Sequence, residues 1–333
     1  MSFKFAVVVA AILSATSVFA VDLELATGGI RLRAVRDPVA GDCSIEFLHD
    51  GRVVQTYASR KPISLSLDGR RIDGTYSDVR LEKDSLVCSG VIDSDSGTRF
   101  RFHDRFMRMS SETFKLSRIV EIERASENDH AFGTLFGLQI ASDGAIDDFE
   151  FFVPAIWYRT NFETKMSGEL AAHSDDQHFM FREDRLPLPV VAARETASGR
   201  TVSLIHCDAD PTTFAGEGRV DHAVDQRMQF GSLGVRQRGG VALTFMFPGS
   251  EGERNHVLHR ARKTWAHRSH PVTIGVRHRY DLLFAFSTTP SYPKAVQRCW
   301  RQAFDAYHPK LRPVDIKRTF DGLIETLDHY WAG

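Results

Sequence analysis

The sequence predicts a mainly β fold, in which a large antiparallel β-supersandwich is followed by two C-terminal α-helices. Over residues 21–290, short runs of alternating apolar and polar residues recur between turn-forming pairs, which is typical of antiparallel strands. After residue 291 the apolar residues instead repeat with the period of an amphipathic helix, and they do so twice. The 24 phenylalanines, beside only 4 tryptophans and 7 methionines, favour a core built from sheet faces.

The first 20 residues have the pattern of a signal peptide. Lys4 supplies the positive charge, residues 5–13 form an apolar run, and Ala20 ends a small-residue cleavage site. The apolar run is too short to span a bilayer. We therefore expect an exported protein, periplasmic or secreted, that begins near Val21 and has no membrane anchor after cleavage.

Charge and cysteine content narrow the class of protein. The net charge is −1 with both signs interspersed, so the sequence lacks the basic patch that nucleic-acid binding requires. No metal-ligand spacing connects the cysteines, so no zinc site is expected, and the thiols either form up to two disulfides or stay free. The sequence also lacks a P-loop and a dinucleotide fingerprint, so no cofactor is expected. The four cysteines are Cys43, Cys88, Cys207 and Cys299. Asp208 and Asp210 could ligate a cation at a strand end, although capping of a turn is the commoner role.

Within the predicted sandwich, Asp50-Gly51 and Asp68-Gly69 are hairpin turns. In residues 98–124, aromatic or aliphatic residues occupy every second position, and we interpret the interruption of this pattern as a bulge. Ser198-Gly199 marks a further turn, and the pattern of residues 251–267 predicts a short helix between strands.

Two amphipathic helices are predicted at the C-terminus, a linker helix within residues 291–310 and a second helix within 311–333. One face of the first helix carries Val296, Cys299, Trp300, Ala303, Phe304 and Tyr307. Pro313 opens the second, whose stripe consists of Phe320, Leu323, Ile324, Leu327 and Trp331. We expect Trp300 to pack against the sandwich. The second stripe could fold back on the sandwich or lack its natural partner, and we expect part of it to stay exposed.

Residues 147–189 differ most from ordinary sandwich sequence. They contain DDFEFFVPAIWYRTNFE and QHFMFREDRLPLP, in which aromatic residues cluster with charged ones. Sugar rings have apolar C–H faces and a hydroxyl rim, so a sugar site needs flat aromatic rings beside bidentate donors and acceptors. The candidate stacking residues are Trp157 and Tyr158, the candidate donors Arg182 and Arg185, and the candidate acceptors Glu183 and Asp184. The arginines would hold sugar hydroxyls or a uronate carboxylate. In the structural alternative, the phenylalanines are core and the REDR run is a solvated surface pairing.

The order of these segments resembles the start of a six-hairpin glycosidase. In that superfamily an N-terminal supersandwich, related to the galactose-mutarotase-like sandwich, precedes an (α/α)6 barrel. The resemblance is carried by FFVPAIWYRTN, by FREDRLPLP and by the helix pair. It implies a carbohydrate-active protein similar to the N-terminal part of an exported glycoside hydrolase, with residues 311–333 as the first barrel helix and an oligo- or polysaccharide as partner.

The same resemblance places the catalytic carboxylates in the barrel, so this chain alone is expected to be inactive. Glycosidic hydrolysis needs two carboxyls roughly 5–10 Å apart. Glu183 with Asp184, and Asp147 with Glu150, are weak candidates for such a pair. The alternative function is that of a non-catalytic sandwich that binds a glycan or stabilises a partner.

Overall fold

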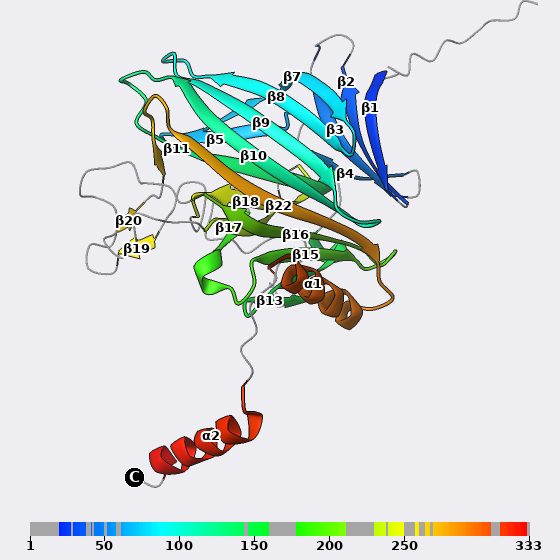
Figure 1. Cartoon of the computed structure of the whole chain (residues 1–333), viewed down its shortest axis with the longest axis vertical. Coiled ribbons are helices and arrows are strands. Elements are labelled where there is room, and N and C mark those ends of the chain that lie inside the picture. Colours follow the sequence, from blue (N-terminus) through cyan, green and yellow to red (C-terminus); the bar gives the residue numbers. More distant parts are fainter. Residues whose placement is uncertain are drawn as a thin grey trace, which may run out of the picture.

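A computed structural model describes residues 20–27, 29–37, 41, 43–49, 52–57, 61–142, 146–159, 178–210, 230–237, 239–249, 257–259, 264–266, 269–307 and 314–331. Almost all of the predicted signal peptide therefore lies outside the described residues. The described chain is mainly β, with two large antiparallel sheets and two C-terminal helices, which confirms the predicted fold class (Figure 1).

The first sheet extends from β7 to β13 through successive antiparallel pairs. Its order is β7 (Tyr76–Glu82), β8 (Ser85–Asp93), β9 (Arg99–Arg108), β10 (Thr113–Arg124), β22 (Arg277–Thr288), β16 (Arg200–Ala209), β15 (Val190–Glu195), β12 (Phe149–Val153) and β13 (Trp157–Arg159).

The second sheet is centred on β11 (Ala131–Ala141), which pairs with β18 (Val241–Phe247), β4 (Arg52–Tyr57), β5 (Ile63–Leu67) and β21 (His270–Pro271). Beyond them lie β17 (Ser232–Gln237), β14 (His178–Arg182) and β6 (Arg70–Gly74). The antiparallel strands β1 (Ala20–Thr27), β2 (Ile30–Arg36) and β3 (Cys43–His49) complete the sandwich. Because β3 pairs with both β4 and β7, it joins the two sheets.

A fully buried ion pair between the neighbouring strands β9 and β10 lies in the aromatic core between the sheets. Arg118 on β10 donates from Nη2 to Asp104 Oδ2 at 2.6 Å, and Tyr76 donates to the same carboxylate. The guanidinium also donates to Tyr280 Oη at 3.3 Å and to the carbonyl oxygen of Leu135 on β11 at 3.3 Å. These bonds satisfy the buried charges and connect the two layers.

The turn predictions have different outcomes. Asp68 and Gly69 have φ values of 47° and 78°, as a two-residue hairpin with positive φ at both positions requires. Strands β3 and β4 pair as predicted, although Asp50 and Gly51 lie outside the described residues. Gly199 has a φ of 72° and turns the chain from β15 to β16.

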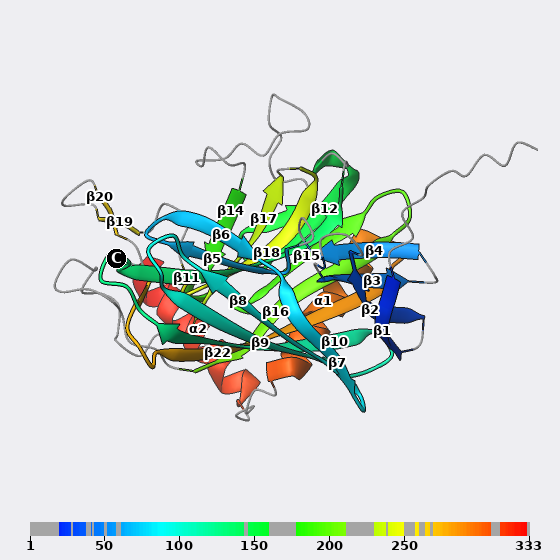
Figure 2. The same cartoon turned by 90° about the horizontal axis from the view of Figure 1, so that it is seen from above.

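Two local predictions were wrong in whole or in part. Residues 98–124 form the hairpin β9–β10 instead of one run, because Ser110 makes a local turn with hydrogen bonds to Thr113 Oγ1 and to the Glu112 amide. The segment does contain an irregularity of the predicted kind, since the register of β9 and β10 shifts between Ile122 and Arg124. Within residues 251–267, the described parts are strands β19 (Val257–His259) and β20 (Thr264–Ala266), not a helix. Val257, Thr264 and Trp265 are residue types that favour strands. This hairpin lies at the opposite end of the molecule from β1 and β2 (Figure 2).

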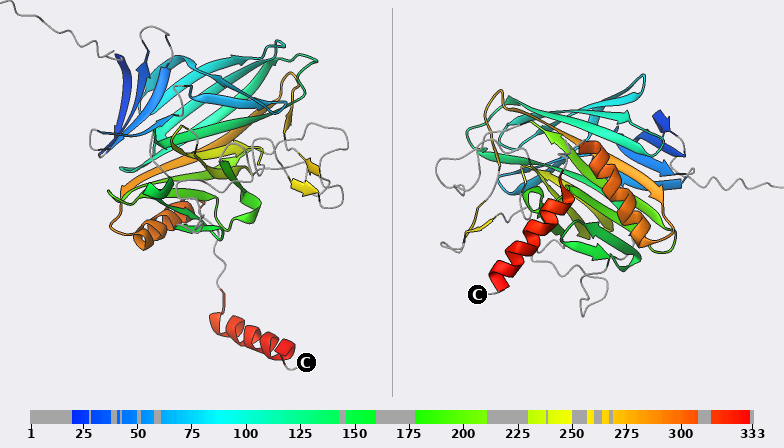
Figure 3. Two further views of the ribbon diagram at one scale, coloured as in Figure 1. Left: turned by 180° about the vertical axis from the view of Figure 1, so that it is seen from behind. Right: turned by 60° about the horizontal axis from the view of Figure 1, so that its bottom comes forward.

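Helix α1 (Tyr292–Tyr307) covers the outer face of the first sheet over β15, β16 and β22 (Figures 1 and 3). Its buried residues Ala295, Cys299 and Ala303 are small and recur every fourth position, which lets the helix approach the sheet closely. The strands beneath are covered on both faces, and this explains the uninterrupted apolar run of β15.

Helix α2 (Ile316–Trp331) lies away from the sandwich (Figures 1 and 3). Phe320 is 61% exposed, and Leu323, Ile324 and Leu327 are at least half exposed, so the predicted exposure of part of this stripe is confirmed at the described positions. The side chain of Trp331 lies outside the described residues. Neither described helix combines the length and apolarity needed to cross a membrane.

Candidate functional site

The hairpin of β12 and β13 positions the aromatic residues of the predicted site. Phe152 pairs with Tyr158, and Val153 pairs with Trp157. Because side chains alternate along a strand, Trp157 and Tyr158 point to opposite faces. The hairpin is closed through Ala155, whose φ is 65° and whose N–H donates to Tyr158 Oη at 3.0 Å.

Trp157 faces the interior and is 3% exposed. Its ring lies 4.8 Å from Phe151, 6.0 Å from Phe179 and 6.5 Å from Phe181, measured between ring centroids. Its indole N–H donates to the carbonyl oxygen of Arg159 at 3.1 Å. These contacts fit the structural alternative, since a sealed ring cannot stack on a ligand.

Tyr158 faces outward and begins an aromatic row, which we define as Tyr158, Phe152 and Trp300. The ring of Phe152 lies 5.7 Å from that of Tyr158 and 6.3 Å from that of Trp300 on α1. Phe152 is 2% exposed, whereas Tyr158 is 43% and Trp300 39% exposed. The row therefore presents two accessible rings on a buried aromatic support, and the predicted packing of Trp300 against the sandwich is confirmed.

Charged residues lie beside the Tyr158 end of the row. Arg159 Nε lies 3.1 Å from Glu150 Oε1, and Arg194 Nη1 donates to Glu150 Oε2 at 2.7 Å. The amide of Arg159 donates to Tyr292 Oη at 2.8 Å, and its guanidinium lies 5.3 Å from the centroid of the Tyr292 ring. Burial raises the pKa of Tyr292 to about 12, so its hydroxyl stays protonated and donates to Phe151 O at 2.8 Å.

The turn at residues 182–185 is held by contacts within the fold. Arg182 Nε donates to Asp184 Oδ1 at 2.9 Å. Glu183 is buried, and its Oε2 accepts from His206 Nδ1 and from the Gly231 amide, each at 2.8 Å. The side chains of Arg182 and Glu183 are thus used within the fold, and both are buried, which differs from the solvated surface pairing of the alternative. Asp184 and Arg185 lie at the surface.

Helix α1 contacts both predicted segments. Tyr292 binds the β12–β13 hairpin, and Tyr307 donates to the carbonyl oxygen of His206, whose side chain binds Glu183. The ring contact between Trp157 and Phe181 also connects the hairpin to the residue that precedes Arg182. The two segments are therefore neighbours, although only some of their side chains are accessible.

Three of the four carboxylates that the sequence suggested for catalysis have other partners, and the fourth, Asp147, is exposed in the turn before β12. Glu183 and Glu150 are bound as described above, and Asp184 pairs with Arg182. Arg279 Nη2 lies 2.6 Å from Asp208 Oδ2 and 3.2 Å from Asp210 Oδ1. Over the described ranges, no group of three or more His, Cys, Asp or Glu residues is placed to hold a metal ion. The four cysteines are thiols and form no disulfide with one another.

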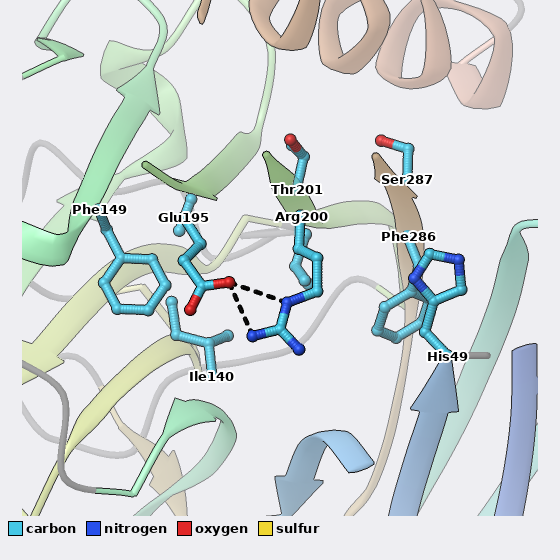
Figure 4. Close-up of a pocket in the computed structure, with 10 residues that line it drawn as sticks. His49, Ile140, Phe149, Glu195, Arg200, Thr201, Phe286 and Ser287 are labelled. Atoms are coloured by element: carbon cyan, nitrogen blue, oxygen red, sulfur yellow. Dashed lines mark hydrogen bonds and ion pairs between the residues drawn. The ribbon is translucent and has the colours of Figure 1, made fainter. Parts of the chain in front are cut away.

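A separate small cavity lies between the first sheet, at β12, β15, β16 and β22, and the strands β3 and β11, which contribute His49 and Ile140 to its lining (Figure 4). Its lining includes Phe149, Thr201, Phe286 and the ion pair of Arg200 Nη2 with Glu195 Oε2, at 2.7 Å. The cavity volume is about 20 Å³. That is room for roughly one water molecule, so a sugar ring does not fit in it.

Arg159 lies in the segment DDFEFFVPAIWYRTNFE that the sequence analysis singled out, and Trp300 was assigned to packing, but neither was given a binding role. The order of small and large residues along α1 is the sequence feature that could have indicated exposed aromatic rings. Positions 295, 299 and 303 carry small residues that face the sheet, so the large aromatics at 300, 304 and 307 must lie on the flank. Trp300, Phe304 and Tyr307 are accordingly 36–39% exposed.

No protein-family model and no curated protein matches this sequence. Among solved structures, a quadruple mutant of α-N-acetylgalactosaminidase NagBb from Bifidobacterium bifidum is similar over 85% of this chain and 39% of its own, with a TM-score of 0.45 and 10% identity. Slr1438 from Synechocystis sp. PCC 6803 is similar over 80% of this chain and 96% of its own, with a TM-score of 0.42 and 10% identity.

A mutant of heparan sulfate lyase HepC from Pedobacter heparinus is similar over 81% of this chain and 37% of its own, with a TM-score of 0.35 and 10% identity. Carbohydrate-active enzymes thus occur among the similar structures, and the chain spans well under half of the NagBb and HepC chains. At these TM-scores the likeness assigns neither a family nor an activity to this chain.

Proposed function

We propose that this chain is the glycan-binding part of an exported carbohydrate-active protein and that the aromatic row holds a sugar ring. The observation that carries the proposal is the pair of exposed rings, Tyr158 and Trp300, on either side of buried Phe152. Flat rings at a surface cover the apolar face of a sugar and leave its hydroxyl rim in water.

The rings are preorganised, which lowers the entropic cost of binding. Tyr158 is held by the hydrogen bond from Ala155 and by its contact with Phe152. Trp300 follows the buried Cys299 on a helix that is fixed to the sheet by three small residues. A ligand therefore meets two rings that are already in place.

In this proposal the chain binds its glycan and does not cleave it. Glycosidic hydrolysis needs a free acid and a free base on opposite sides of the bond. Glu150 is shared by two arginines, and Glu183 is buried and bound to His206 and Gly231. We accordingly assign the catalytic carboxylates of the six-hairpin-like protein to residues outside this chain.

Titration calorimetry with a panel of soluble oligo- and polysaccharides tests the proposal. We expect measurable binding by the wild type, and about tenfold weaker binding after Tyr158→Ala or Trp300→Ala with little change in melting temperature. Phe320→Ala on α2 is the matched control, because it removes an exposed aromatic ring away from the row. No binding by the wild type, or equal losses in all three variants, overturns the proposal.

Export rests on the signal-peptide pattern, and N-terminal sequencing of the mature protein tests it. The first residue should be Val21 or one within a few positions of it. Mature protein that still begins at Met1 contradicts export by cleavage.

A further inference from the structure

We propose that the glycan held by the aromatic row carries an anionic group, a carboxylate or a sulfate, and that Arg159 binds it. This inference rests on the proposed function and adds a ligand class to the same site. It starts from a charge imbalance, because two arginines, Arg159 and Arg194, share the single carboxylate of Glu150.

The two arginines are not equivalent. Arg194 has a side chain that is 11% exposed, and besides Glu150 it donates to the carbonyl oxygen of Thr289 from Nε at 3.3 Å and from Nη2 at 3.2 Å. Its donors are therefore engaged within the fold. Arg159 touches Glu150 through Nε at 3.1 Å, and its side chain is 58% exposed. The surplus positive charge of the cluster thus lies on the accessible arginine.

The backbone holds Arg159 beside the row. Its φ of 59° is in the left-handed region, which is unfavourable for a residue with a side chain. The conformation is held by the bond from its amide to Tyr292 Oη and by the stacking of its guanidinium over the Tyr292 ring. As a result, a planar donor with five N–H groups is fixed next to Tyr158, one of the two exposed rings.

The surrounding charges agree with an anionic ligand. Helix α1 carries Lys294, Arg298 and Arg301, against a single acidic residue, Asp305. Arg298 pairs with Glu112 of the neighbouring turn, which leaves Lys294 and Arg301 as additional positive charges on the helix that bears Trp300. The whole chain has a net charge of −1, so this positive surface is a local feature.

A sugar that stacks on Tyr158 and carries a carboxylate or sulfate can direct that group to the guanidinium, where two parallel N–H···O bonds form. A neutral sugar offers only hydroxyl groups to the same donor, and these bonds are weaker. The inference therefore predicts a preference for anionic over neutral glycans that depends on Arg159, whereas the aromatic row contributes to both.

Calorimetry with matched polymers tests this. Polygalacturonate is compared with its fully methyl-esterified form, and dextran sulfate with dextran, so that the first pair probes the carboxylate and the second the sulfate. We expect the wild type to bind at least one anionic polymer about tenfold or more tightly than its neutral partner. Arg159→Gln should abolish that preference, and Arg159→Lys should retain part of it. Tyr158→Ala should weaken binding to anionic and neutral polymers alike.

Arg80→Gln is the control for non-specific attraction, because Arg80 is an exposed arginine on β7, outside the site. The inference is overturned if the wild type binds anionic and neutral polymers equally. It is also overturned if the preference for anionic polymers survives Arg159→Gln or falls equally with Arg80→Gln. Each of these results leaves the proposed function in place. Failure of the wild type to bind any polymer overturns both.

Discussion

The guanidinium of Arg159 lies 5.3 Å from the centroid of the Tyr292 ring, and the amide of Arg159 donates to the hydroxyl of the same tyrosine. Tyr292 is the first residue of α1, whereas Arg159 ends β13. This double contact links the helix to the hairpin that carries Tyr158. It explains why residues 133 positions apart in the sequence form one surface.

Substitution of Trp157 tests the division between buried and exposed aromatic residues. Trp157→Ala removes a sealed ring that contacts Phe151, Phe179 and Phe181, so we expect a loss of about 3–5 kcal/mol in the free energy of unfolding. Tyr158→Ala, on the neighbouring residue, should cost much less. Urea titrations of both variants measure the difference, and equal stability losses would contradict the assignment of the two faces.

The buried ion pair gives a prediction for the core. Asp104→Asn leaves Arg118 as a buried charge without its carboxylate, so the free energy of unfolding should fall by about 3–5 kcal/mol. Replacing Arg118 and Asp104 together by leucine should cost less than the single change, because no charge is left unpaired. Chemical denaturation of the single and double variants tests this, and a double variant less stable than the single one contradicts it.

His278 predicts a specific loss of stability in acid. Its ring is buried against Phe132, His270, Phe247 and Tyr280. This burial is the main reason why the pKa of His278 lies well below 6.5, and the nearby His270 and Arg118 lower it further. As the pH falls through 6.5, the unfolded chain therefore binds a proton that the folded chain excludes. The contribution of His278 to the free energy of unfolding is fully present above pH 6.5, and it decreases by up to about 1.4 kcal/mol per pH unit below that pH.

The comparison of wild type with His278→Phe isolates this residue. The folded state lowers the pKa of Asp93, Glu123 and Asp281, through their arginine or lysine partners, so these carboxylates reduce stability in more acidic solution in both proteins. Between pH 7 and pH 5, the variant should lose less stability than the wild type in urea titrations. Parallel pH curves for the two proteins would show that His278 does not titrate on unfolding.

The two helices should respond differently to substitution. On α2, Leu323→Gln changes a side chain that is more than half exposed, so we expect a stability change within about 0.5 kcal/mol. On α1, Ala303→Leu adds volume to a buried contact with the sheet and should cost about 1–3 kcal/mol. Thermal melts compare the two, and a large loss for Leu323→Gln would indicate that α2 is packed in solution.

The elements of the fold could be predicted because their signals are local. Alternation identified the strands, Asp68-Gly69 identified a turn, and the 3.6-residue period identified α1 and α2. Adjacent residues of a strand point to opposite faces, but the sequence offered both Trp157 and Tyr158 for stacking because it does not show which face is covered. That is decided by Phe179 and Phe181 on β14, which pack on Trp157 from a distant part of the chain.

The binding roles were harder to predict for the same physical reason. Glu183 is engaged because β16 places His206 and the chain before β17 places Gly231 beside it, and neither residue is near Glu183 in the sequence. Trp300 reaches Phe152 only because small residues bring α1 onto the sheet. The division of residues 291–310 and 311–333 into a linker helix and a first barrel helix stays a prediction.

The central claim is that a sugar ring binds on the row of Tyr158, Phe152 and Trp300. A crystal structure of the chain with a bound oligosaccharide from the calorimetric panel tests it most directly. The account predicts a sugar ring in van der Waals contact with Tyr158 or Trp300, with Arg159 hydrogen-bonded to its rim. An oligosaccharide bound elsewhere, with both exposed rings bare, would contradict it.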